Sequence, residues 1–335
     1  MLSSSVGVIG AGAWGTALAQ VAAKSQVPAG SSVWLWCRDP MAAAEINRSR
    51  MNDARLPDVR LVPNVVATSE RSALAACDIV LIATPAQTVR QVLKQFSAVL
   101  RPGARVVITA KGLERGTAAF MTDILADECP SCEPLVLSGP SFAGDVVRGL
   151  PTAVTLAAQS MEIAHPVAAA LSIPTFRLYV SDDLAGVQVG GAVKNVLAIA
   201  CGIVAGRKLG ESARAALIAR SFAELNRIGR VLGARGETLG GLSGLGDLVL
   251  SCSSAQSRNF RLGQAMGEGR SPGEILGSQR GTSEGAYTAS VVDTIATKHA
   301  IEVPIISAVR AILDGDCAID EAIEQLLQRP LKSEV

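Results

Sequence analysis

Short apolar runs alternate with amphipathic segments along the first half of the chain. The runs that we predict to be strands are Val6–Ile9, Val33–Cys37, Val65–Ala67, Ile79–Ala83, Arg105–Thr109, Leu135–Ser138 and Ala153–Ala157. Segments with apolar residues at helical spacing lie between them, near residues 15–24, 70–76, 87–99 and 117–128. Alternating strands and helices are typical of a parallel sheet covered on both faces. We therefore predict an α/β, Rossmann-like N-terminal domain whose sheet is rich in parallel strands.

The second half of the chain has a different pattern. Strand signals end near Val180, and residues 182–328 show helical spacing. Glycine-rich segments, which we predict to be turns, interrupt this spacing at Gly240–Gly246 and Gly267–Pro272. The change predicts two domains, an α/β domain over residues 1–181 and an all-α domain over residues 182–335.

The most apolar window, Val187–Ala205, approaches the length of a membrane span but contains Lys194 and Asn195. Burying a lysine and an amide inside a bilayer is costly, so we predict a buried core helix and no membrane insertion. Asp182 and Asp183 precede this window, and acidic side chains are favourable where a helix begins. The first apolar stretch runs into a glycine loop instead of a cleavage site, so no secretory signal is expected.

Composition excludes further classes of protein. Among 335 residues, 31 are Lys or Arg and 30 are Asp or Glu, which gives a formal net charge of +1. A nearly neutral chain offers no broad basic surface, and no nucleic-acid partner is expected. Hydrophobic residues make up 49% and aromatic residues 3%, which predicts a large core of small and β-branched side chains.

Seven cysteines are scattered along the chain, several of them within apolar runs. Reduced thiols packed as small hydrophobic groups are typical of a cytoplasmic protein. The one close pair, Cys129 and Cys132, is interpreted as a loop with two free thiols; the alternative is half a zinc site or a redox pair. His165 and His299 have no ligand spacing to this pair, and no metal is expected.

A G-x-G-x-x-G pattern follows the first predicted strand and opens the first predicted helix. Gly10 would form a tight turn, Gly12 would admit phosphates, and Gly15 would let the helix approach the strand. Backbone N–H groups and the positive end of the helix would then face a pyrophosphate. This context predicts a dinucleotide site; the alternative is a structural turn.

The end of the second predicted strand indicates which dinucleotide is preferred. An NAD-selective site carries an acidic residue about 20 residues beyond the loop, whereas this chain has Cys37 followed by Arg38. Because arginine can pair with a 2′-phosphate, NADP is favoured over NAD. Asp39 comes two positions late and is interpreted as a turn residue before Pro40.

Two polar segments follow later strands, at the sheet edge where open α/β proteins bind ligands. Lys111 is placed there to meet an anionic substrate; the alternative is a lone solvated lysine. Gly139 and Ser141 would supply backbone and hydroxyl groups near the reactive end of the cofactor, unless they form only an ordinary turn.

The most informative residues are Lys194 and Asn195, which interrupt an otherwise apolar helix. Burial without a partner is costly for a lysine and lowers its pKa toward neutrality, which suits proton exchange with a substrate hydroxyl. Asp247, another lone charge in an apolar stretch, is the predicted partner. The structural alternative is that Lys194 snorkels to solvent or pairs with an acid without taking part in catalysis.

Gln256–Asn259 precedes another amphipathic helix. Ser257 is the predicted N-cap, so that Arg258, Asn259 and the first free N–H groups would together hold a phosphate dianion. The alternative is an ordinary capped surface helix.

Together these segments resemble the NAD(P)-dependent glycerol-3-phosphate dehydrogenases of bacterial type. The stretches that carry the resemblance are GAGAWGTALA from Gly10, AKGLE at 110–114, SGPSFA at 138–143, GGAVKN at 190–195, GLGDLVLSC at 244–252 and QSRN at 256–259. They follow the order of the family and extend over most of the chain. The resemblance implies a Rossmann-like domain, an all-helical domain and an active site between them.

The resemblance also implies roles for individual residues. Lys194 would be the general acid/base, with Asn195, Asp247 and Ser251 in the active-site network. The substrate would contact Lys111, Gly139, Ser141, Ser257, Arg258 and Asn259, the last three through its phosphate. The cofactor would contact Gly10, Gly12, Ala13, Trp14, Gly15, Arg38, Lys111, Ala143, Arg258, Thr282 and Glu284. Around Thr282 and Glu284 the local sequence departs from the common family pattern.

The implied reaction is the reversible reduction of dihydroxyacetone phosphate by NAD(P)H, which supplies sn-glycerol 3-phosphate for phospholipid synthesis. The apolar helical half and the habit of the family suggest a homodimer. Two other functions stay open at this point. A β-hydroxyacid-type dehydrogenase would share the glycine loop and a Lys-Asn pair, but would not need Gln256–Asn259. A non-catalytic NAD(P)H sensor would tolerate loss of Lys194, Asp247 and Arg258, which are all present.

Overall fold

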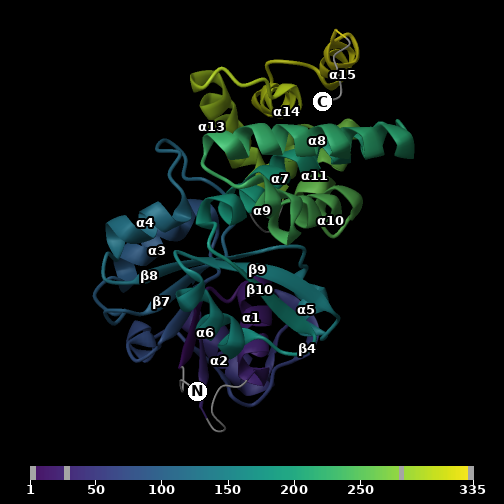
Figure 1. The fold of residues 1–335 in the computed structure, drawn as a ribbon. Coiled ribbons are helices and arrows are strands. Elements are labelled where there is room, and N and C mark those ends of the chain that lie inside the picture. Colours follow the sequence, from purple (N-terminus) through teal and green to yellow (C-terminus); the bar gives the residue numbers. More distant parts are fainter. Residues whose placement is uncertain (1–4, 26–30, 279–282, 331–335) are drawn as a thin grey trace.

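The computed structural model describes residues 5–25, 31–278 and 283–330. Its N-terminal half is built on a sheet, and its C-terminal half is helical and lies above the sheet in Figure 1. The predicted fold class is therefore confirmed.

The described residues of the N-terminal half form an eight-stranded sheet in the order β10-β9-β8-β7-β6-β1-β2-β5. Its strands are β1 (Val6–Ile9), β2 (Val33–Trp36), β5 (Val65–Thr68), β6 (Ile79–Ile82), β7 (Arg105–Ile108), β8 (Glu133–Ser138), β9 (Thr152–Ala158) and β10 (Phe176–Ser181). Every neighbouring pair is parallel except β8 and β9, which are antiparallel. The central strands β1 and β6 are buried along their whole length, as strands covered on both faces must be.

Helices cover both faces of this sheet. They are α1 (Ala13–Lys24), α2 (Pro40–Ser49), α3 (Val89–Phe96), α4 (Met121–Glu128), α5 (Ala143–Val147) and α6 (Met161–Leu171), with the 3₁₀ turns η1 (Arg71–Leu74) and η2 (Ala86–Thr88). A hairpin of β3 (Met51–Asn52) and β4 (Leu56–Arg60) lies between α2 and β5. Two predicted helices are shorter in the structure: the segment near 70–76 forms only η1, and the segment near 117–128 becomes helical at Met121.

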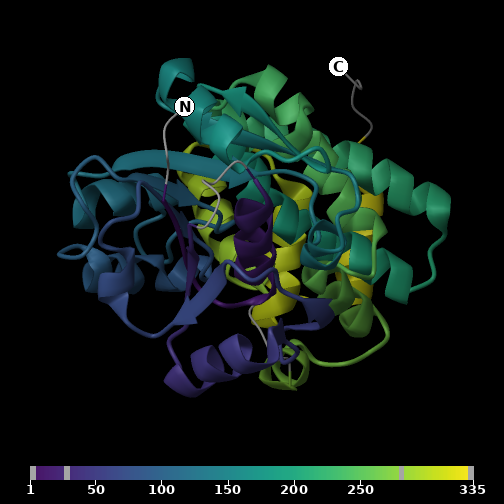
Figure 2. The same cartoon turned by 90° about the horizontal axis from the view of Figure 1, so that it is seen from below.

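The C-terminal half packs around one central helix. Its elements are α7 (Leu184–Gly206), α8 (Glu211–Val231), α9 (Gly236–Gly240), the π-helix η3 (Leu242–Gly246), α10 (Asp247–Ser253), α11 (Arg258–Gly267), α12 (Pro272–Ser278), α13 (Glu284–Lys298), α14 (Pro304–Asp314) and α15 (Ile319–Leu327). Helices α8, α10, α11, α13 and α14 all contact α7. Figure 2 looks along the direction in which the two halves are stacked, with the C-terminal helices partly behind the sheet half.

Helix α7 contains the most apolar window of the sequence. It is long and apolar enough to span a membrane, but 78% of its most apolar window is buried inside the protein, as expected for a core helix. Asp183 caps its start, because the Asp183 carboxylate accepts a hydrogen bond from Gly186 N at 2.8 Å. A Cβ added at Gly263 would lie 1.9 Å from the Ile199 oxygen, so glycine is required where α11 crosses α7.

One of the predicted turns is a helix. The segment predicted as a turn at Gly240–Gly246 continues from α9 into η3, in which Gly246 N donates to the Gly241 oxygen at 3.0 Å. This bond spans five residues, one more than in an α-helix. Glycines normally predict a break, but here they permit close packing: a Cβ at Gly244 would lie 2.0 Å from the Leu239 oxygen.

Candidate active site

The glycine loop connects β1 to α1 and has the geometry of a phosphate cradle. Gly10 has φ +112°, a conformation that side chains rarely adopt. A Cβ at Gly15 would lie 1.9 Å from the Gly10 oxygen, whereas a Cβ at Gly12 would meet no atom within 4 Å. The turn and the helix approach therefore need glycine. The space in front of Gly12, next to the start of α1 at Ala13, is open to a ligand. The residues present thus fit a dinucleotide pyrophosphate.

Asn52 holds this loop in place by hydrogen bonds, and no sequence motif predicts it. Its Nδ2 donates to the Ala11 oxygen at 3.0 Å and to Thr16 Oγ1 at 2.8 Å. The side chain comes from β3, about 40 residues away in sequence, and Asn52 is 7% exposed. No local motif marks such a residue, because its partners are known only once the hairpin is placed against α1.

Other expected cofactor residues lie around the same edge of the sheet. Arg38 follows β2 and is exposed. Asp39 is the N-cap of α2, where its carboxylate accepts a hydrogen bond from Met41 N at 2.9 Å, so this acid is engaged by its own helix. The Trp14 ring, on α1, lies 6.5 Å from the Phe176 ring, centroid to centroid. Ala143 is the first residue of α5.

Glu284 joins the two halves of the molecule at the start of α13. Its Oε1 accepts a hydrogen bond from Ala86 N at 3.0 Å, while Oε2 is buried without a hydrogen-bond partner among the described residues. Burial raises the pKa of this carboxyl, an effect that the Ala86 N–H and the charge of Arg258 oppose. An unpartnered buried oxygen is available to a ligand hydroxyl. Thr282, which the family resemblance also placed at the cofactor, lies outside the described residues.

Asp247 connects two lysines from the two halves of the chain. Lys194 Nζ, from the middle of α7, donates to Asp247 Oδ1 at 2.6 Å and to Ser251 Oγ at 2.7 Å. Lys111 Nζ, from the loop after β7, donates to Asp247 Oδ2 at 2.6 Å and to the Gly139 oxygen at 3.0 Å. The side chains of Lys194 and Asp247 are 8% and 1% exposed. One buried carboxylate therefore holds two ammonium groups at the boundary between the halves.

The surroundings of Lys194 shift its protonation. Desolvation lowers the pKa of Lys194 to about 8, and the positive charge of Lys111 adds to this effect, while Asp247 opposes it. A lysine with a pKa of about 8 exchanges a proton readily near neutral pH. The side chain is thus suited to act as a proton donor and acceptor.

A chain of amides extends from this cluster. Asn195 Nδ2 donates to the Lys111 oxygen at 3.1 Å, and Asn195 Oδ1 accepts from Asn259 Nδ2 at 2.9 Å. Asn259 Oδ1 in turn accepts from Gly285 N at 3.1 Å. The side-chain oxygens of both asparagines are therefore engaged inside the protein, and the amides tie α7, α11 and α13 to the Lys111 loop.

The remaining polar residues lie at helix and strand ends. Ser257 is the N-cap of α11, as predicted from its sequence context, and its hydroxyl accepts from Phe260 N at 3.3 Å. Arg258, the first residue of this helix, is exposed. Gly139 (φ +145°) follows β8, and its oxygen accepts from both Lys111 and the Ser141 hydroxyl, the latter at 3.0 Å.

Among the described residues, no group of three or more His, Cys, Asp and Glu side chains lies close enough to hold a metal ion. All seven thiols are free. Cys132 N donates to the Cys129 oxygen at 3.0 Å, which makes the Cys129–Cys132 segment a tight turn. A hydrogen bond between the two thiols raises the pKa of Cys129 and lowers that of Cys132.

Comparison with known proteins gives a consistent result over both halves. Residues 5–164 match the family described as NAD-dependent glycerol-3-phosphate dehydrogenase N-terminus, and residues 183–324 match its C-terminus. Glycerol-3-phosphate dehydrogenase [NAD(P)+] of Bradyrhizobium diazoefficiens is 54% identical over 331 residues, and that of Parvibaculum lavamentivorans is 50% identical over 329 residues; both alignments cover 98% of each chain. The crystal structure of glycerol-3-phosphate dehydrogenase from Coxiella burnetii superposes with a TM-score of 0.91 at 37% identity, covering 97% of this chain and 99% of that one.

Proposed function

Since this chain belongs to the NAD-dependent glycerol-3-phosphate dehydrogenase family, we propose that Lys194, Lys111 and Asp247 form the centre at which it performs the family reaction. The chain is an NAD(P)-dependent oxidoreductase that interconverts dihydroxyacetone phosphate and sn-glycerol 3-phosphate. The observation that supports this centre most strongly is the buried Asp247 carboxylate, which accepts hydrogen bonds from both lysines at 2.6 Å.

Lys194 is the proton donor in the direction of ketone reduction. When bound, the cofactor supplies the hydride. As charge develops on the substrate oxygen, the Lys194 ammonium gives up a proton to it and stabilises it. Asp247 keeps that ammonium charged in spite of its burial, because the carboxylate favours the protonated form. In the reverse direction neutral Lys194 removes the hydroxyl proton.

The start of α11 anchors the substrate phosphate. The first N–H groups of a helix have no carbonyl partner within it, and they lie at its positive end. The N–H groups of Arg258 and Asn259 and the Arg258 guanidinium would hold the dianion, with Ser257 capping the helix. The Asn259 side chain serves instead to join α11 to Asn195. Anchoring a remote phosphate orients the carbonyl carbon toward the hydride donor.

The dinucleotide would lie along the edge formed by the glycine loop, Arg38 and Ala143. Gly10, Gly12, Ala13, Trp14 and Gly15 would hold its pyrophosphate, and the free Oε2 of Glu284 would accept a ligand hydroxyl. Gly139 and Ser141, beside the Lys111 ammonium, would contact the substrate.

We further propose that the protein is a cytoplasmic homodimer that supplies phospholipid synthesis. The free thiols support the cytoplasmic location, and exposed apolar side chains of the helical half, such as Val249, support the homodimer.

Substrate choice is tested by offering ketones with different anionic groups. Purified protein is expected to oxidise NADPH or NADH when dihydroxyacetone phosphate is added, and to remain inactive with β-keto acids. The phosphate site at α11 is the physical reason, because a helix start and a guanidinium suit a dianion. Loss of nicotinamide absorbance measures both rates. Faster turnover of a keto acid would instead identify a β-hydroxyacid-type enzyme, and turnover of neither would favour a sensor.

Cofactor preference is proposed to follow Arg38, and NADP is favoured. Arg38→Ser is expected to raise the KM for NADPH about tenfold while changing the KM for NADH little, because the 2′-phosphate loses a charge-assisted partner. Arg48→Ser is a matched control, since Arg48 is an exposed arginine on α2 paired with Glu45. An unchanged KM for NADPH in Arg38→Ser would contradict the assignment.

A further inference from the structure

Lys111 lies in an irregular loop that nevertheless delivers its ammonium to a fixed position. The loop extends from the end of β7 to the start of α4 at Met121 and contains no helix or strand. Irregular segments lack the ladder of hydrogen bonds that fixes a strand. Lys111 Nζ must reach both Asp247 and the Gly139 oxygen. Asn195 Nδ2 holds the loop at the Lys111 oxygen, and the stretch that follows, residues 113–117, needs a support of its own.

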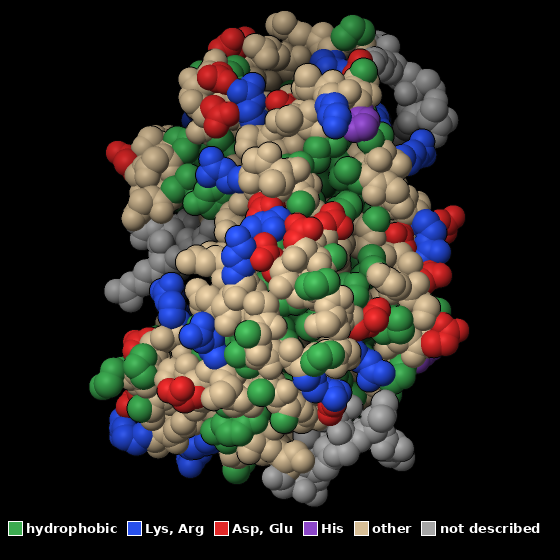
Figure 3. Space-filling view, turned by 90° about the vertical axis from the view of Figure 1, so that its left-hand side faces the viewer, with side chains coloured by type: hydrophobic (Ala, Val, Ile, Leu, Met, Phe, Trp, Pro, Cys, Tyr) green, Lys and Arg blue, Asp and Glu red, His purple; other side chains and the backbone are tan. Residues whose placement is uncertain are grey.

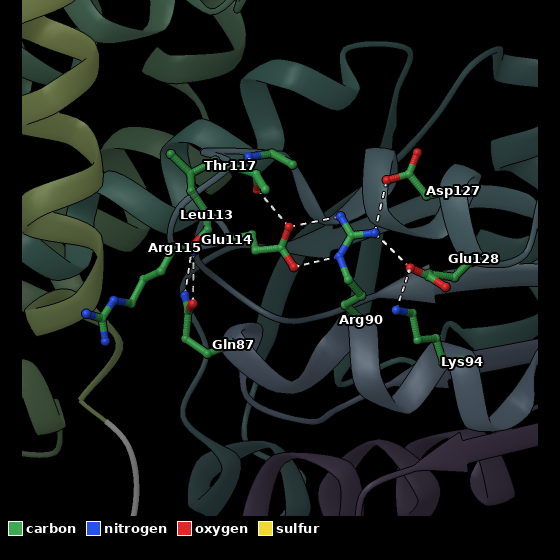
Figure 4. A network of polar contacts seen from close by, with 10 residues as sticks. Gln87, Arg90, Lys94, Leu113, Glu114, Arg115, Thr117, Asp127 and Glu128 are labelled. Atoms are coloured by element: carbon green, nitrogen blue, oxygen red, sulfur yellow. Dashed lines mark hydrogen bonds and ion pairs between the residues drawn. The ribbon is translucent and has the colours of Figure 1, made fainter.

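Two side chains from the segment after β6 supply that support. Gln87, on η2, donates from Nε2 to the Leu113 oxygen at 2.8 Å and accepts from Arg115 N at 3.0 Å through Oε1. Figure 4 shows these paired bonds on one side of the loop. A single amide side chain thereby fixes the backbone on both sides of Glu114.

Arg90, on α3, forms a bidentate ion pair with Glu114 of the same loop. Its Nε and Nη2 donate to the two carboxylate oxygens of Glu114 at 2.8 and 2.9 Å. This planar fork fixes orientation as well as distance, which a lysine cannot reproduce. The Arg90 hydrogen bond also holds the pKa of Glu114 below its usual range, so that the carboxylate stays charged near neutral pH.

The third guanidinium nitrogen of Arg90, Nη1, forms hydrogen bonds to two carboxylates of α4. It donates to Glu128 at 2.7 Å and to Asp127 at 3.1 Å, and the dashed contacts of Figure 4 run from α4 through Arg90 to the loop. The Arg90 and Glu114 side chains are 28% and 16% exposed, so solvent screens this pair less than a fully exposed one. In Figure 3, which looks onto the side where α3 and α4 lie, acidic and basic side chains gather near the middle of the face.

We propose that Arg90 and Gln87 are positioning residues for the reaction, which hold the loop of residues 111–117 so that Lys111 can meet Asp247 and the substrate. This inference rests on the proposed role of Lys111. Arg90 and Gln87 act only through that loop, and their removal misplaces the ammonium without removing any group that reacts.

The test is a double-mutant cycle between Arg90 and Lys111. Arg90→Lys keeps the charge but loses the fork, and it is expected to lower kcat/KM for dihydroxyacetone phosphate about tenfold to a hundredfold, mainly through KM. Lys111→Met is expected to cause a larger loss. The double variant Arg90→Lys/Lys111→Met should be no worse than Lys111→Met alone, since Arg90 has nothing left to position. Steady-state kinetics of the four proteins measure the cycle, and thermal denaturation monitors folding.

Lys94→Met is the matched control. Lys94 contacts the same Glu128 at 3.8 Å and is 62% exposed. It acts on Glu114 only weakly, through its charge, so the kinetics of Lys94→Met should equal those of the unaltered protein. Additive losses in the double variant, a normal KM in Arg90→Lys or an equal defect in Lys94→Met would each overturn the positioning role. A Lys111→Met protein with normal kinetics would instead refute the proposed function of Lys111, which distinguishes the two failures.

Discussion

Replacing Lys194 with methionine is expected to lower kcat for dihydroxyacetone phosphate reduction by about a thousandfold. The Lys194 ammonium is the buried donor that contacts both Asp247 and Ser251. Methionine has a similar length and shape but carries no proton, so under the proposed mechanism the developing alkoxide would lose its acid and a positive charge. The measurement is the rate of NADPH oxidation at saturating concentrations of both substrates.

Two controls separate this loss of chemistry from a loss of structure. Asp247 keeps Lys111 as its partner in Lys194→Met, so no buried charge is left alone, and the affinity for NADPH should be preserved in a fluorescence titration. Lys298→Met, on the exposed end of α13, should keep full activity. A Lys194→Met protein with near-normal kcat would refute the mechanism.

Asp247→Asn is expected to produce a large loss of activity, and the loss should depend on pH. The pKa of Lys194 is about 8 in the intact site, where the charge of Asp247 opposes desolvation. Reduction needs the ammonium form, so its rate should fall as pH rises through about 8. Without the carboxylate the midpoint of this decrease should lie about one to three pH units lower. At pH 8, kcat/KM should then be about a hundredfold lower than in the unaltered protein.

The pH profile of kcat/KM for reduction measures this shift, because that parameter reports the pKa values of the free enzyme. Activity of Asp247→Asn should recover in part as the pH is lowered, because protonation restores the Lys194 ammonium. A misfolded protein would not recover in this way, and thermal denaturation at the same pH values checks folding directly. A profile with the same midpoint in both proteins would show that Asp247 does not set the protonation of Lys194.

The sheet was predictable where its strands are continuously apolar. Ile79–Ile82 is buried on both faces, and such a run can be recognised without any partner. The β3–β4 hairpin was not predicted, because Pro57 and Asp58 interrupt the strand pattern and Asp58 has φ +62°. Strand β10 alternates buried and exposed positions and carries Arg177, a weaker signal than a continuous apolar run.

The candidate site was predictable as a set of residues but not as a network. Lys194 stands out because a charge in an apolar helix is conspicuous, and Asp247 stands out for the same reason. That Asp247 also holds Lys111 depends on how α10 meets the loop after β7, a contact across more than a hundred residues. Arg90 gives no local signal at all, since an arginine on an amphipathic helix is usually a solvated one.

A π-helix precedes Asp247, so the number of residues in this helix determines the direction in which the Asp247 carboxylate points. Its wide turn packs against α7, where a Cβ at Gly190 would lie 2.5 Å from the Ser243 oxygen. Each residue of a helix turns the next by about 100°, so deleting one residue within Leu242–Gly246 would regularise the helix and rotate the Asp247 carboxylate away from both lysines. Insertions and deletions in surface loops that do not contact this segment should leave that orientation unchanged. Related enzymes that keep this chemistry are therefore expected to vary in loop length around the molecule while preserving the number of residues in this segment.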